Sequence, residues 1–134
     1  MSSKLLKLSD QFVVSAQTTY IQQQSDSESN RFVFAYTIAI LNNSDTPAQL
    51  ISRHWLIKDA NQKIEEVYGE GVVGQQPLIK PGESYSYTSG AVLETEMGTM
   101  EGRYFLISTS SENANNEFEI LIPKFVLSVP RTLH

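Results

Sequence analysis

The chain has 134 residues, a formal net charge of −5 at pH 7 and no cysteine. The acidic charge argues against non-specific nucleic-acid binding, and the lack of cysteine excludes disulfides, thiolate nucleophiles and Cys-ligated zinc. No stretch approaches the run of about 20 apolar residues that spans a bilayer, so we expect a cytoplasmic protein that contacts neither nucleic acid nor membrane.

The length and the 40% hydrophobic content fit a single folded domain. Residues 1–9 carry two lysines among three leucines but lack the apolar core of a secretory signal. We therefore expect a flexible tail over residues 1–9 and one domain over residues 10–134.

Alternating apolar and polar side chains predict strands along the first half of the chain. Asp10 to Gln22 alternates, and the polar run that follows, up to Asn30, is expected to be a solvated loop. Arg31 to Leu41 has apolar residues on both faces, which indicates a central strand. Residues 42–47 form a turn that reverses the chain.

The next two predicted strands differ in character. Leu50 to Lys58 contains Trp55, the best single candidate for the core. Lys63 to Tyr68 carries two apolar residues among charges, which is typical of an edge strand.

In the second half, the Pro81-Gly82 turn precedes a strand from Ser84 to Val92. We expect Glu94 to Gly102, which is acidic and contains two glycines, to be a connection across one end of the molecule. Arg103 to Ser108 is the next strand, residues 109–116 form a hairpin tip, and a last strand begins at Phe118 and bends or bulges at Pro123.

Seven or eight strands with no helix of ten residues predict an all-β fold, an antiparallel sandwich of the immunoglobulin or fibronectin type III kind. A partly open barrel is the alternative. Tyr85, four residues after Pro81, is placed like the tyrosine at an inter-sheet corner of fibronectin type III domains.

The stretch from Gly69 to Gly74 matches the spacing G-x-G-x-x-G, which in dinucleotide-binding folds cradles a pyrophosphate between a strand and a helix N-terminus. Adjacent valines and Pro77 leave no helix to follow it, and Glu70 would repel phosphate. We interpret the stretch as a turn between two strands. The alternative is an anion-binding nest, aided by a divalent cation, and its residues are Gly69, Glu70, Gly71, Val72, Val73 and Gly74.

Several ordered segments carry a family resemblance. They are Arg31-Phe32-Val33-Phe34-Ala35-Tyr36, Arg53-His54-Trp55-Leu56-Ile57, Gly69 to Pro77, Pro81-Gly82-Glu83 with Tyr85 to Gly90, Gly98-Thr99-Met100-x-Gly102-x-Tyr104, and Ile122-Pro123-x-Phe125. Together they resemble the bacterial ApaG family, from about Phe12 to the final Leu133-His134.

That resemblance implies a fibronectin-type-III-like sandwich of unsettled biochemical role, linked genetically to cobalt and magnesium handling. It also implies similarity to a domain of eukaryotic F-box proteins and of a polymerase-interacting protein, where the module is thought to recognise proteins. The phosphate-contacting glycines proposed for the family correspond to Gly69, Gly71 and Gly74.

The residues do not favour catalysis or a transition-metal site. His54 and His134 are the only histidines, and we interpret His54 as a paired structural residue. No nucleophile with an oriented base is evident, so we expect no enzyme and no cofactor. Two acidic groups could hold hard divalent cations, although surface charge is the commoner explanation. They are Glu65, Glu66 and Glu70, and Glu94, Glu96 and Glu101.

The sequence predicts a complete β-sandwich but offers no catalytic constellation, which favours a protein-interaction module. The partner would bind loops at one end of the sandwich or pair with an edge strand. A second copy of the chain is a further candidate partner, through Lys63 to Tyr68.

Overall fold

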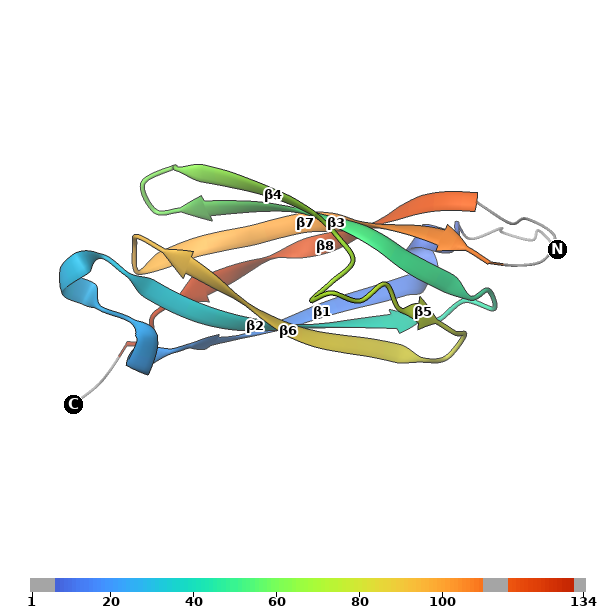
Figure 1. Cartoon of the computed structure of the whole chain (residues 1–134), viewed down its shortest axis with the longest axis horizontal. Helices are drawn as coiled ribbons and strands as arrows, with labels where there is room; N and C mark the ends of the chain where they lie inside the picture. Colours follow the sequence, from blue (N-terminus) through green and yellow to red (C-terminus); the bar gives the residue numbers. More distant parts are fainter. Residues whose placement is uncertain (1–6, 110–115, 132–134) are drawn as a thin grey trace, which may run out of the picture.

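The computed structural model describes residues 7–109 and 116–131. Over these ranges the chain forms two facing antiparallel sheets, which confirms the predicted all-β sandwich (Figure 1). Helical structure within them consists of short 3-10 turns at Leu8–Gln11, Gln22–Gln24 and Ser27–Ser29. The strands are β1 (Phe12–Tyr20), β2 (Phe32–Asn42), β3 (Ala48–Asp59), β4 (Ile64–Glu70), β5 (Leu78–Ile79), β6 (Ser84–Leu93), β7 (Met97–Ser108) and β8 (Asn116–Ser128).

The two sheets differ in size and leave one long side of the sandwich open. One has the order β1-β2-β6, and the other has the order β4-β3-β7-β8 with β5 beside β3. Strands β1 and β8 contact each other and close one side. At the opposite side each sheet ends in an edge strand, β4 in the larger sheet and β6 in the smaller one.

The core lies between the sheets and is rich in aromatic rings. The inward residues of β2 alternate with half-exposed ones, and the strand is central in its sheet, as predicted. Trp55 is 2% exposed and packs edge-on against Tyr36 and Phe125, with ring centroids 5.4 and 5.8 Å away. The prediction that Trp55 lies in the core is confirmed.

Strand β8 runs through its proline, as the sequence indicated. Met100 pairs with Phe125 and Gly102 pairs with Ile122, so Pro123 and Lys124 together lie opposite Glu101. Two residues facing one is a β-bulge, and the bulge accommodates a residue that has no N–H for the ladder.

The predicted connection from Glu94 to Gly102 is wrong from Met97 onward, because β7 begins there. Its glycines are strand residues that let the backbone of β3 come close. A β-carbon on Gly102 would overlap the carbonyl oxygen of His54, and one on Gly98 would lie 2.6 Å from the carbonyl oxygen of Lys58. Close approach, rather than a turn, requires these glycines.

Smaller differences concern the ends of elements. Asp10 lies in a 3-10 turn instead of the first strand, and Leu8 packs against the core although residues 1–9 were expected to be a tail. Leu78–Ile79 forms a short strand that we had not predicted. The expected hairpin tip at residues 109–116 falls mostly outside the described residues, but Ser108 pairs with Asn116 on either side of it.

Candidate functional site

The glycine stretch forms a tight turn after β4. The amide of Gly71 donates to the carbonyl of Ile51 over 2.7 Å, and Val72 and Gln75 exchange amide-to-carbonyl bonds of 2.8 and 3.0 Å. Val73 and Gly74 occupy the tip with φ angles of 49° and 77°. Two positive φ angles between a bonded pair are the geometry of a type I′ turn. The amides of Gly71 and Val72 therefore already donate within the protein.

Local packing explains why the first two positions are glycines. The guanidinium of Arg53 crosses Gly69, and its Nη1 donates to the carbonyls of Gly71 and Glu70 over 2.7 and 3.3 Å. Gly71 has a φ of 66° and faces the Gln75 carbonyl at a distance that no β-carbon tolerates. The loop thus offers carbonyl oxygens to an arginine, which an anion-binding nest would not do.

The candidate cation ligands do not gather. Glu94 lies 3.4 Å from the Nζ of Lys63, and Glu101 lies 3.9 Å from that of Lys124. Within residues 7–109 and 116–131 no group of three or more histidine or acidic side chains is arranged to hold a metal, so Glu94, Glu96 and Glu101 form no such set.

His54 is paired on the outer face of the larger sheet. Its Nε2 lies 2.9 Å from Oε2 of Glu66, and its ring stacks on Tyr68 with a centroid separation of 4.2 Å. His134 lies outside the described residues.

Strand β4 leaves one backbone edge unpaired in the described part of the chain. It pairs with β3 alone, and bonds at both ends, Asp59 to Lys63 and Gly71 to Ile51, fix which residues face β3. Because antiparallel pairing alternates, the N–H and C=O groups of Ile64, Glu66 and Tyr68 point away from the sheet. This confirms the edge-strand prediction and leaves β4 with a backbone edge that can pair with another chain.

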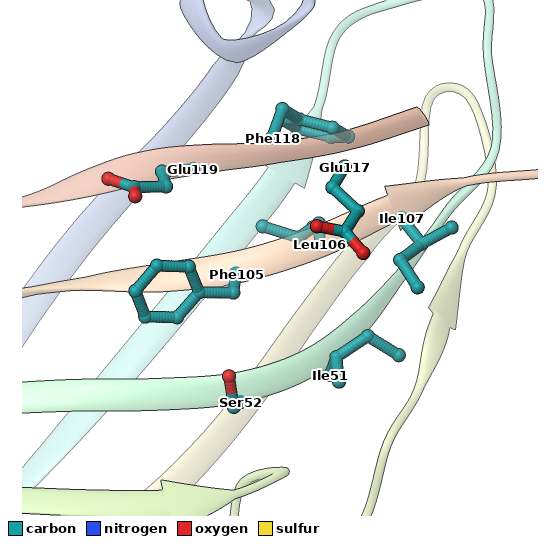
Figure 2. A pocket seen from close by; sticks show the side chains of 8 residues that line it. All are labelled: Ile51, Ser52, Phe105, Leu106, Ile107, Glu117, Phe118 and Glu119. Carbon is teal, nitrogen blue, oxygen red and sulfur yellow. The ribbon is translucent and has the colours of Figure 1, made fainter. Parts of the chain in front are cut away.

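A hollow of about 480 Å³ lies on the larger sheet over β3, β7 and β8 (Figure 2). Figure 2 shows Phe105, Ile107 and Ile51 forming its apolar part, with Glu117 and Glu119 on β8 beside them. The sequence did not single out this hollow, because its residues come from three strands without a common spacing.

A cleft of about 350 Å³ lies between the two edge strands β4 and β6. Arg53 and Trp55 of β3 and Tyr36 of β2 line it together with side chains of both edges. Burial raises the pKa of the Tyr36 hydroxyl, and a hydrogen bond with Ser89 opposes that rise. Sequence reasoning placed Trp55 in the core but missed this cleft.

Two further tyrosines form a buried pair beside the cleft residues. The hydroxyls of Tyr87 and Tyr104 hydrogen-bond to each other between the sheets. Burial raises the pKa of both groups well above that of an ordinary tyrosine. Both hydroxyls therefore stay protonated to a higher pH than an ordinary tyrosine would.

Comparison with known proteins identifies the family. The family model described as the ApaG domain matches residues 22–108, which is more than half of the chain. The chain belongs to the ApaG family. Protein ApaG of Dechloromonas aromatica (strain RCB) is 52% identical over 115 residues, covering 86% of this chain and 87% of that protein. Protein ApaG of Thiobacillus denitrificans is 49% identical over 124 residues, covering 92% and 94%.

Solved structures of similar sequence have the same fold. The crystal structure of an ApaA protein from Bordetella pertussis superposes with a TM-score of 0.84 at 46% identity, covering 90% of this chain and 95% of that one. The X-ray structure of a second structural-genomics target has a TM-score of 0.86 at 44% identity, covering 96% and 94%. Among the described residues no helix is long and apolar enough to cross a membrane.

Proposed function

We propose that this ApaG-family chain is a cytoplasmic, non-enzymatic module that recognises another protein by pairing an extended segment with β4. The unpaired outer edge of β4 carries the proposal. A peptide strand added there would bond to the backbone of Ile64, Glu66 and Tyr68. Tyr68 is 69% exposed and stacks on His54, so it offers a rigid aromatic surface next to that edge.

Charge indicates what kind of segment fits. Glu65, Glu66 and Glu70 give β4 three carboxylates within its seven residues. A second copy of β4 would bring like charges together, which opposes pairing. A basic extended segment is the favoured partner.

A titration with short β-prone peptides tests this mode. We expect a lysine-rich peptide to shift the amide resonances of Ile64, Glu66 and Tyr68, and its acidic counterpart to leave them unchanged. Glu66→Lys should weaken binding of the lysine-rich peptide about tenfold. The matched control is Glu117→Lys, the same charge change on β8, which should alter the affinity less than about twofold.

Two outcomes would contradict the proposal. Equal binding of the acidic and basic peptides would remove the charge argument, and shifts confined to β1 or β8 would place the partner elsewhere. Concentration-dependent shifts at β4 without any peptide would identify a second copy as the partner instead.

Phosphate binding by the glycine turn is the less supported candidate, because the Gly71 and Val72 amides donate to Ile51 and Gln75. We expect no heat on titration with millimolar pyrophosphate, with or without magnesium. Saturable heat that Gly71→Ala abolishes would reverse this ranking. The family's link to cobalt and magnesium handling would, in our proposal, act through the bound partner.

A further inference from the structure

We propose that the cleft between β4 and β6 binds a small monocarboxylate that carries an apolar group. The site is separate from the backbone edge of β4, and the proposal stands whether or not a peptide pairs there. It rests on an unpaired donor, an unpaired positive charge, and a small cavity with an apolar wall.

The first observation is an indole N–H without an acceptor. Trp55 lines the cleft and is 2% exposed, and its Nε1 is the one buried side-chain polar atom in the described ranges that has no hydrogen-bond partner. Buried donors are almost always paired in folded proteins, and an orphaned one is costly. Nε1 is itself covered, so a ligand acceptor would reach it when the side chains that cover it move aside on binding.

The second observation is the charge of Arg53. Its Nη1 bonds two backbone carbonyls, and across the described residues it forms no ion pair with a carboxylate. A guanidinium has five N–H donors in a planar fork that matches a carboxylate. The half-buried cation therefore has no carboxylate in direct contact, and an anionic ligand would provide one.

The remaining lining defines the rest of the ligand. The hydroxyls of Tyr36 and Ser89 add polar contacts, while Ile57, Val67 and Val92 supply apolar surface. A volume of about 350 Å³ is at the small end of ligand pockets. A carboxylate with a branched aliphatic group fits this combination.

Negative charge at the rim selects against more highly charged anions. Glu65 lines the cleft, and the neighbouring cavity is lined by Asp59, Glu65 and Glu94 against a single Lys63. A second negative charge on the ligand would meet this repulsion. The cleft therefore favours a monocarboxylate over phosphate or pyrophosphate.

Trp55 is the only tryptophan of the chain, so its fluorescence reports directly on the cleft. We would titrate the full chain with N-acetyl-leucine, isovalerate, N-acetyl-leucinamide and inorganic phosphate. We expect a saturable change in emission with the two acids, and at least tenfold weaker binding of the neutral amide and of phosphate. Amide resonances of Ser89 to Val92 and of Glu65 to Val67 should shift with the same affinity.

Two variants that leave the indole in place sharpen the test. Glu65→Gln should increase the affinity for N-acetyl-leucine about threefold, because it removes a negative charge from the rim of the cleft. Ser89→Ala should lower the affinity for N-acetyl-leucine, and an unchanged urea midpoint of this variant would show that its fold is retained. Glu66→Lys, designed for the peptide site, is the control and should change acid binding less than about twofold, because Glu66 lies on the opposite face of the sheet.

The proposal is overturned if N-acetyl-leucine and N-acetyl-leucinamide bind with equal affinity. It is also overturned if Trp55 emission shows no saturable change up to about 50 mM acid, a concentration at which even a weak ligand would bind. Amide shifts confined to the outer face of the larger sheet would refute it as well. Tighter binding of phosphate than of either acid would identify an oxyanion site of different selectivity and would equally refute it.

Discussion

The guanidinium group of Arg53 lies 2.5 Å from the position that a β-carbon on Gly69 would occupy. Gly69 is therefore glycine because an arginine passes over it on the way to the carbonyls of the following turn. The spacing that resembles a phosphate-binding motif has, at this position, a packing explanation.

Replacing Gly69 by alanine should displace Arg53 and cost about 1–2 kcal/mol of unfolding free energy, the worth of its hydrogen bonds to Gly71 and Glu70. Arg53→Ala should cost a similar amount. The double variant should lose little more than either single variant, because both changes remove the same bonds. Urea unfolding of the four proteins measures the coupling, and strictly additive losses would contradict the shared mechanism.

Val73→Asn should stabilise the protein by about 1 kcal/mol, because a β-branched residue is strained at positive φ and asparagine followed by glycine is the preferred pair for a type I′ turn. Val73 has a φ of 49° and is exposed, so the change should leave the core intact. Thermal unfolding measures the gain. A lower melting temperature than that of the original chain would show that Val73 makes contacts worth more than its strain.

Gly102→Ala should cost more than about 3 kcal/mol, because its β-carbon would overlap the backbone of His54, and backbone cannot move aside as a side chain can. Gly90 is the matched control, since it also lies within a strand but its β-carbon would meet only Phe34 O at 3.4 Å. Gly90→Ala should change stability by less than about 1 kcal/mol. Similar losses in both variants would contradict the explanation.

Asn42→Ala should cost about 2–4 kcal/mol, because it leaves several buried groups unpaired. Asn42 is fully buried; its amide donates to the carbonyls of Thr46 and Ile79 over 2.9 Å, and its oxygen accepts from Ser44. The neighbouring Asn43 is exposed, so Asn43→Ala is the control and should cost under about 0.5 kcal/mol. Equal urea midpoints for the two variants would show that the Asn42 bonds contribute little.

The buried tyrosines should make the protein sensitive to alkali. Unfolded tyrosine loses its proton near pH 10, whereas burial keeps Tyr87 and Tyr104 protonated in the folded state. Their contribution is fully present below pH 10. Above it the folded state binds more protons than the unfolded one, so unfolding free energy should fall by up to about 1.4 kcal/mol per pH unit for each residue.

Urea unfolding between pH 8 and pH 11 measures this slope. The variant with both Tyr87→Phe and Tyr104→Phe should show a shallower decline above pH 10, since neither ring can then ionise. An unchanged slope in that variant would assign the alkaline loss to other groups.

Strand positions were predictable where burial imposes a period of two. The inward residues of β2 and the buried Trp55 follow such a period. Gly98 and Gly102 misled the prediction, because glycine occurs both in turns and where two backbones come close, and local sequence does not separate these causes. The bulge at Pro123 was predictable because proline cannot donate to a ladder.

The candidate sites were less accessible from sequence. The edge character of β4 follows from its charges, so it could be predicted. The cleft could not, because Tyr36, Arg53 and Ser89 come from three strands that meet only in the folded sandwich. The one local signal was the Arg53-His54-Trp55 run, in which alternation sends Arg53 and Trp55 to the same side.

A molecule made mostly of strands has to avoid stacking edge to edge into fibrils. At Pro123 the last strand of the larger sheet, β8, is bulged and lacks an N–H, which adds to the cover that β1 gives this edge against an incoming strand. We expect a straightened strand, as in Pro123→Val, to form thioflavin-positive aggregates sooner than the original chain.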